Sequence, residues 1–238
     1  MQTFEIGRPG VSITRAEPGA SASAISVEAM GLSALVSPVL DIQAVRDWES
    51  LIGSHDGLVV TSGNAARLMA ASALDRATPV FAVGAATAAL LRVGGFQNIL
   101  SADGDVADLA ALVAAKGKGR RFVYVSGNDV SRDLVELLAD DGVFIQRCVI
   151  YRAEMVSEWP IAPLPEPPLA VLFHSPRGAE AFAFLHSHTA LCPLASVSAV
   201  AISAKAAEPI SALGWHRVLV AKFPNEKAIL AELADLRR

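Results

Sequence analysis

Short apolar runs rich in β-branched residues alternate with longer alanine- and leucine-rich amphipathic stretches along the whole chain. The short runs predict strands at residues 11–14, 34–37, 57–61, 79–83, 98–100, 121–125, 144–151, 169–173, 196–202 and 217–221. The longer stretches predict helices at residues 19–30, 64–74, 85–94, 105–116, 131–141, 176–187, 204–213 and 224–236. This alternation predicts parallel sheets covered by helices, which is the α/β class.

Glycine and proline mark the ends of these predicted elements. Gly31, Gly95, Gly142 and Gly214 each follow a predicted helix, where a left-handed C-terminal cap favours glycine. The stretch 157-SEWPIAPLPEPP-168 holds five prolines. Proline at this density is excluded from helix interiors and central strands, so the stretch is a natural domain boundary.

The chain also contains an internal repeat. Three pairs of segments are similar, in the same order along the chain: 11–40 with 122–151, 58–69 with 171–182, and 82–100 with 201–219. The offsets agree closely, at 142 − 31 = 111, 175 − 62 = 113 and 214 − 95 = 119. The chain therefore predicts two copies of one α/β unit, with a cleft between them.

A polar cluster, 61-TSGN-64, separates a predicted strand from a predicted helix, and Ser175 holds the equivalent place in the second copy. Ligands of open parallel sheets bind beyond the carboxyl ends of the strands. Helix N-termini there supply free N–H groups and a dipole that favours anions. Two interpretations stay open for Ser62 and Ser175, which are helix capping alone and capping combined with ligand contact. Pro176 strengthens the capping interpretation for Ser175.

Composition narrows the class of protein. With 53% hydrophobic and 18% charged residues the chain is globular rather than disordered. A net charge of −4 argues against a nucleic-acid partner but allows an acidic ligand. No apolar run approaches the roughly 18 residues of a membrane helix, and 1-MQTFEIGRPG-10 lacks the core of a signal peptide. We expect a cytoplasmic protein without a membrane partner, in which Cys148 and Cys192 are reduced.

Signatures of several other chemistries do not occur in the sequence. It has no P-loop, GxGxxG or GxSxG motif. His186 and His188 have no third ligand nearby, so we expect no metal. His174 and Ser175 resemble a base and nucleophile, but neighbouring residues of an extended strand point to opposite faces.

Taken in order, several segments make the chain similar to the uroporphyrinogen-III synthase family. They are 11-VSITRAEPG-19, 35-LVSPVLDI-42, 59-VVTSGNAA-66, 82-AVGAATAALL-91, 150-IYRA-153, 171-VLFHSPRGAEAF-182 and 223-FPNEKAILAEL-233. The resemblance covers nearly the whole chain and is weakest from residue 196 onward.

This resemblance implies two flavodoxin- or Rossmann-like α/β lobes joined by a two-stranded linker. One lobe is discontinuous, made of residues 1–38 with 156–238, and the other comprises residues 43–149. The linkers are residues 39–42 and 149–155. The repeat taken alone also allows two sequential lobes.

The resemblance further implies a cofactor-free lyase of tetrapyrrole synthesis. Its substrate is linear hydroxymethylbilane, which carries eight carboxylates and is closed to uroporphyrinogen III with inversion of ring D and loss of water. Departure of the terminal hydroxyl leaves an electrophilic azafulvene, which the enzyme must shield from water. A monomer is expected, with transient hand-over of substrate from hydroxymethylbilane synthase.

Candidate site residues follow from these interpretations together. Tyr151 is a candidate general acid for the leaving hydroxyl, since phenols are protonated at neutral pH. The candidate substrate-binding residues are Arg15, Thr61, Ser62, Gly63, Asn64, Gly84, Thr87, Ser126, Ser175, Ser203 and Lys205. Ala206 aligns with Thr87 in the second copy, where family members often carry a hydroxyl, so Lys205 beside it is expected to replace that contact by an ion pair.

Two other function classes remain open at this point. One is a two-lobed binding protein for an acidic small molecule, without catalysis. The other is a nucleotide-dependent α/β transferase, against which the missing phosphate-binding loop counts.

Overall fold

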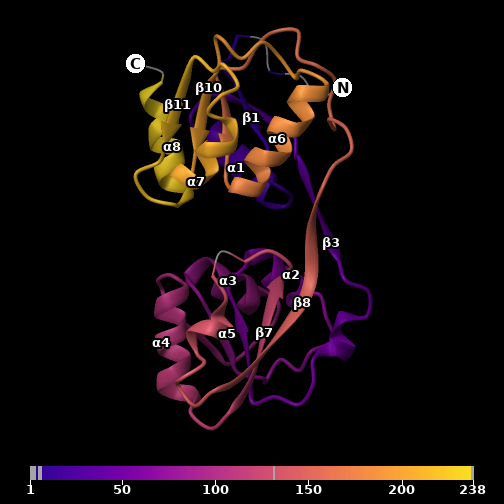
Figure 1. Ribbon diagram of the computed structural model, residues 1–238, viewed down its shortest axis with the longest axis vertical. Helices are drawn as coiled ribbons and strands as arrows, with labels where there is room; N and C mark the ends of the chain where they lie inside the picture. The colour runs from indigo at the N-terminus through magenta and orange to yellow at the C-terminus, as the bar shows by residue number, and fades with distance from the viewer. Residues whose placement is uncertain (1–3, 5–6, 131, 237–238) are drawn as a thin grey trace. The chain divides into compact units, whose positions relative to one another are not determined.

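The computed structural model describes residues 4, 7–130 and 132–236, which form two compact units (Figure 1). The first unit combines the residues up to Asp41 with those from Glu154 onward, and the second comprises Ile42–Ala153. Strands β3 (Leu40–Ala44) and β8 (Phe144–Met155) carry the chain from one unit to the other and are neighbours in one sheet. No helix of the described part of the chain is long and apolar enough to cross a membrane.

The first unit contains a five-stranded parallel sheet in the order β11-β10-β9-β1-β2. Its strands are β1 (Gly10–Ile13), β2 (Ser33–Val36), β9 (Ala170–Phe173), β10 (Ser198–Ala201) and β11 (Arg217–Val220). Its helices are α1 (Gly19–Glu28), α6 (Pro176–His188), α7 (Ala204–Ala207) and α8 (Glu226–Asp235). Side chains of α1 and α8 pack on one face of the sheet, while Phe182 of α6 packs edge-on against Phe173 on the other.

The second unit contains a six-stranded sheet in the order β3-β8-β7-β4-β5-β6. Besides β3 and β8, its strands are β4 (Gly57–Val60), β5 (Val80–Ala82), β6 (Ile99–Ser101) and β7 (Arg121–Gly127). Its helices are α2 (Gly63–Ala70), α3 (Ala85–Val93), α4 (Val106–Gly117) and α5 (Leu134–Leu137), with a 3₁₀ helix at Trp48–Leu51. The α/β class and the parallel sheets predicted from the alternation are confirmed.

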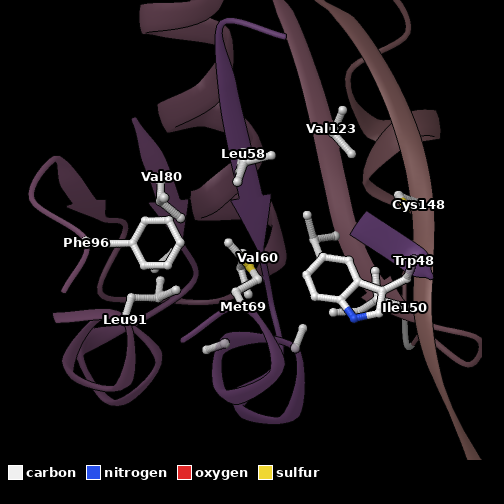
Figure 2. Packing of buried hydrophobic residues seen from close by; sticks show 14 of the residues in the cluster. Trp48, Leu58, Val60, Met69, Val80, Leu91, Phe96, Val123, Cys148 and Ile150 are labelled. Carbon is white, nitrogen blue, oxygen red and sulfur yellow. The ribbon is translucent and has the colours of Figure 1, made fainter. Parts of the chain in front are cut away.

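Helices cover both faces of the second sheet. On one face Ala65, Ala66 and Met69 of α2 pack with Ala88 and Leu91 of α3. Figure 2 shows this core, in which Trp48 lies beside Ile150 of β8. On the other face the buried side chains come from α4 and α5: Leu109, Ala110, Val113 and Leu134. Burial on both faces explains why the central strands β4 and β5 read as continuous apolar runs.

The two sheets share one strand order, which agrees with the internal repeat. Equivalent strands are β11 and β6, β10 and β5, β9 and β4, β1 and β7, and β2 and β8. Gly95 and Gly214, which match in the repeat, have φ of 88° and 80°, the left-handed conformation that glycine favours; Gly95 lies just after α3 and Gly214 beyond the 3₁₀ turn Glu208–Ile210. In the first unit the β1–α1–β2 segment comes first in the chain, whereas its counterpart β7–α5–β8 comes last in the second.

Two predicted helices are much shorter than expected, and a third, predicted at 64–74, ends early as α2 at Ala70. The helix expected at residues 131–141 forms only as α5; residue 131 lies outside the described residues, and Asp133 caps the helix through its carboxylate. The helix expected at 204–213 is α7 followed by a 3₁₀ turn, Glu208–Ile210. Pro209 has no N–H to donate, so the α-helical hydrogen bonds are interrupted there.

The proline-rich stretch 157–168 lies inside the first unit, so it is not the boundary. Trp159 and Leu164 are buried, and Trp159 Nε1 donates to the carbonyl of Thr189 at 2.7 Å. The boundary lies earlier, within β3 and β8. Cys148 and Cys192 are both buried and form no disulfide.

Candidate functional site

Most of the candidate residues lie at the carboxyl ends of parallel strands or just beyond them. In the second unit, Thr61 to Asn64 follow β4, Gly84 follows β5, and Ser126 is the penultimate residue of strand β7. In the first unit, Arg15, Ser175 and Ser203 follow β1, β9 and β10. The fold therefore supplies each unit with its own polar edge, where helix N-termini and side chains gather.

Ser62 and Tyr151, which are 89 positions apart in the chain, are joined by a hydrogen bond between their hydroxyl groups at 2.8 Å. Ser62 has extended backbone and caps α2, since its Oγ accepts from Asn64 N at 3.1 Å and Ala65 N at 3.5 Å. Tyr151 is 8% exposed, so its ring packs in the core while its hydroxyl reaches the helix N-terminus. Capping and contact with Tyr151 thus use the same Ser62 oxygen.

A β-bulge aims Tyr151 at Ser62. Ser126 pairs with Val149, but the next pair is Gly127 with Tyr151, so Ile150 is an extra residue in β8. Ile150 and Tyr151 consequently belong to the same buried cluster, although alternation would send neighbouring side chains to opposite faces. Gly127 makes the room, since a Cβ there would lie 2.5 Å from Tyr151 Cζ.

Thr61 contacts the second tyrosine of the chain. Its Oγ1 lies 2.9 Å from the hydroxyl of Tyr124, which belongs to the opposite face of the sheet and is 1% exposed. Burial raises the pKa of Tyr124, although the hydrogen bond from Thr61 opposes the rise. Thr61 and Ser62 are adjacent in the chain, and each lies at hydrogen-bond distance from the hydroxyl of a different tyrosine.

A hollow of about 450 Å³ opens at the N-terminus of α3. It is lined by Val83, Gly84, Ala85, Ala86, Thr87, Asp103 and Gly104. Gly84 is the N-cap of α3 in extended conformation, and Thr87 in the first turn is buried. The first turn of a helix offers unpaired N–H donors that favour an anionic group, whereas the carboxylate of Asp103 in the same lining opposes one.

In the first unit, Ser175 and Ser203 are both helix caps. Ser175 Oγ accepts from Gly178 N at 3.0 Å, and Ser203 Oγ accepts from Ala206 N at 3.3 Å. Lys205 is exposed on α7, while Ala206 is buried beneath it. Ser175 and Ser203 therefore cap α6 and α7, and the exposed ammonium of Lys205 lies in the first turn after the second cap.

Arg15 lies in a polar cluster that the sequence did not predict. Its Nη1 is 3.2 Å from Glu226 Oε2 and 3.3 Å from Ser23 Oγ, and the same carboxylate oxygen is 2.9 Å from His174 Nε2. Burial lowers the pKa of His174. The contact with Glu226 raises this pKa, but it offsets only part of the lowering. Burial raises the pKa of Glu226, but the hydrogen bond from His174 and the charge of Arg15 outweigh it and the net pKa is lowered. The only signal for Glu226 in the sequence was its place as an acidic residue in the first turn of the helix after Asn225.

Ser126 is bound by another residue that the sequence analysis missed. Arg147 Nε donates to Ser126 Oγ at 2.9 Å, and Ser126 Oγ donates to the carbonyl of Gly127 at 3.0 Å. Gln146 and Arg147 interrupt the apolar residues of β8, and that was the only signal available in the sequence.

Comparison with known proteins decides the family. A family model described as uroporphyrinogen-III synthase HemD matches residues 21–231. The chain belongs to the uroporphyrinogen-III synthase family. Its members are cyclising lyases, so membership favours the synthase activity over a non-catalytic binding protein.

Solved structures agree with the fold of this family. The uroporphyrinogen-III synthetase of Helicobacter pylori is 17% identical, with a TM-score of 0.64 over 97% of this chain and 100% of that chain. A mutant uroporphyrinogen III synthase of Thermus thermophilus is 20% identical, with a TM-score of 0.50 over 96% of this chain and 98% of that chain. No curated protein sequence matches the chain significantly. The two-lobed α/β architecture of the synthase family is therefore present here.

Replacing Ser62 with alanine is expected to lower stability and turnover together. Loss of the cap costs about 1 kcal/mol of unfolding free energy, and loss of the Tyr151 contact leaves the phenol without this partner. Urea denaturation and steady-state kinetics measure the two effects. Asp105→Ala is the matched control, because Asp105 caps α4 and its cap bonds involve no tyrosine. A stability loss with unchanged kinetics would reduce Ser62 to a cap.

His174 is expected to make this synthase less stable below neutral pH. Because its folded pKa is lowered, the unfolded chain takes up the proton first, and stability is lost as the pH falls below about 6.5. Glu226, whose pKa is also lowered, adds a loss in the same direction at more acidic pH. Between pH 7.5 and 5.5 the melting temperature should fall further for the wild type than for His174→Gln, which retains a donor for Glu226. Equal falls would contradict this role of His174.

Proposed function

We propose that this chain closes hydroxymethylbilane to uroporphyrinogen III, with inversion of ring D and loss of water. The observation that carries the residue assignment is the phenol of Tyr151, buried at the carboxyl edge of the second sheet and hydrogen-bonded to the Ser62 cap of α2. This contact holds a proton donor at a helix N-terminus, where the N–H groups favour a nearby anion. A substrate carboxylate and the leaving hydroxyl can then use adjacent parts of one edge.

In the proposed reaction Tyr151 donates its proton to the terminal hydroxyl of the substrate, and the C–O bond breaks to release water. The azafulvenium cation that remains is attacked by the substituted carbon of ring D, which forms a spiro intermediate. Fragmentation and reclosure invert the ring, and the proton lost on rearomatisation restores the phenol. The sequence of steps is redox-neutral, so its balance requires no cofactor.

Carboxylate binding is assigned to the donors at the two polar edges. In the second unit these are the N-termini of α2 and α3, with Thr61, Ser62, Asn64 and Thr87. In the first unit they are the N-terminus of α6 and the side chains of Arg15, Ser203 and Lys205. Arg15 already pairs with Glu226, so a substrate carboxylate would share its guanidinium with that residue.

Lys205→Ala is expected to raise KM by about two- to fivefold with little change in kcat, because an exposed ion pair contributes up to about 1 kcal/mol. Lys116→Ala, which removes an exposed lysine from the last turn of α4, serves as the control. Steady-state kinetics at low ionic strength gives the sharpest comparison. An unchanged KM would remove Lys205 from the binding residues.

One experiment tests the proposed function as a whole. Hydroxymethylbilane is generated enzymatically in the presence of the purified chain, and the oxidised product isomers are separated by chromatography. We expect type III product well above a reaction without the chain, since unassisted closure gives the uninverted isomer. Type I product alone would reject the function and would favour the binding-protein alternative.

We further propose that the synthase works as a cytoplasmic monomer and receives its substrate by transient hand-over from hydroxymethylbilane synthase. The supporting reason is chemical, because hydroxymethylbilane closes spontaneously and a short path between enzymes limits that loss.

A further inference from the structure

Arg147 fixes the carboxyl end of β7 and the residue that follows it. Its Nη2 donates to the carbonyl oxygens of Gly127 at 2.7 Å and Asn128 at 2.6 Å, while Nε donates to Ser126 Oγ. Nη1 lies 3.7 Å from Asp133 Oδ2, at the cap of α5. One planar guanidinium therefore holds three successive residues and a helix cap, which suits the fixed fork of donors that arginine carries.

The segment held by Arg147 is also the segment that fits around Tyr151. Gly127 lies against the phenol, where an added Cβ would be 2.8 Å from the hydroxyl oxygen. Asn128 N donates to the carbonyl of Tyr151 at 2.9 Å. Both contacts occur at the bulge that turns Tyr151 towards Ser62. Movement of Gly127 or Asn128 would therefore move the phenol.

The hydrogen bonds of this cluster are partly or fully shielded from water. The side chain of Arg147 is 24% exposed and that of Asp133 is 30% exposed. Ser126 is fully buried, so its hydroxyl depends on protein partners. A half-buried guanidinium that is matched to several acceptors resists displacement by water.

We propose that Arg147 is a positioning residue for the reaction, which acts by holding the β7–β8 bulge and so aiming the hydroxyl of Tyr151. This inference rests on the proposed function and on Tyr151 as proton donor. Arg147 spends its Nε and Nη2 donors on Ser126, Gly127 and Asn128, so it can act through these residues without touching the substrate.

The test is a double-mutant cycle on the full chain. Arg147→Gln is expected to lower kcat by about ten- to a hundredfold with KM changed less than threefold, since small misplacements of a reacting group cost up to about 10²-fold. In a Tyr151→Phe background the same change should lower kcat less than twofold, because the group that Arg147 aims is gone. If the kcat losses of Arg147→Gln and Tyr151→Phe multiplied in the double variant, the two residues would act independently and the proposal would be overturned.

Two further variants keep this test decisive. Arg121→Gln removes an exposed arginine at the amino end of β7 and should leave kcat unchanged in both backgrounds. If Arg147→Gln does not fold, Ser126→Ala is measured in the same two backgrounds instead, because it removes one of the hydrogen-bond acceptors of Arg147. If the wild-type chain makes no type III isomer, the proposed function itself fails. If it does make that isomer but the effects multiply, only the role of Arg147 fails.

Discussion

Tyr151→Phe is expected to lower kcat by about 10²-fold or more, because the substitution removes the proton that the leaving hydroxyl takes up. The ring remains in its buried position, and the main structural loss is one hydrogen bond with Ser62, worth about 1 kcal/mol. Single-turnover rates of type III product with enzymatically generated hydroxymethylbilane measure the change directly.

Tyr124→Phe is the matched control for this experiment. Tyr124 is the only other tyrosine of the chain, and its hydroxyl also lies at hydrogen-bond distance from a residue after β4, at 2.9 Å from Thr61. Its removal should cost similar stability while kcat stays within twofold. If Tyr151→Phe also left kcat within twofold of the wild type, the general-acid role of Tyr151 would be refuted.

Gly127→Ala is expected to lower kcat by about tenfold or more, with a stability loss of about 1–3 kcal/mol. The new methyl group would lie 2.5 Å from Tyr151 Cζ, inside any permitted contact. Strand β7 is paired with β4 as far as Val125, and Gly127 is paired with Tyr151 of β8, so we expect the ring to move more readily than the backbone. The phenol would then leave its place beside Ser62.

Gly53→Ala provides the comparison for Gly127, since Gly53 is exposed and an added Cβ there meets nothing within 4 Å. Kinetics and thermal denaturation of the two alanine variants should differ clearly. If Gly127→Ala kept the kcat of the wild type, the reaction would tolerate a displaced phenol. That result would argue against tight positioning of Tyr151.

Local sequence was sufficient for features that neighbouring residues encode. Ser62 and Ser175 were identified as helix caps because an extended residue with a short hydroxyl before a helix has few other uses. Gly95 was identified as a helix end because a positive φ favours glycine. Where a local rule was overlooked the prediction failed, as with Pro209, which shortens α7.

The candidate site was predicted less completely than the fold. Tyr151 was selected by family resemblance, but its contact with Ser62 depends on one extra residue in β8, which no periodic pattern signals. Arg147 and Glu226 were missed because their partners lie far away in sequence. Glu226 meets Arg15 across 211 positions, and a single charged residue in a pattern does not reveal such a partner.

The sequence by itself determined the α/β class, most strands and helices, the repeated unit and the polar edge after each central strand. These features depend on side-chain periodicity and on backbone preferences that act within a few residues. Only the tertiary structure decided which polar groups meet: Ser62 with Tyr151, Arg147 with the end of β7, and His174 with Glu226 and Arg15. The physical reason is that sheet register, including a single bulge, fixes these contacts, and register results from packing of the whole unit.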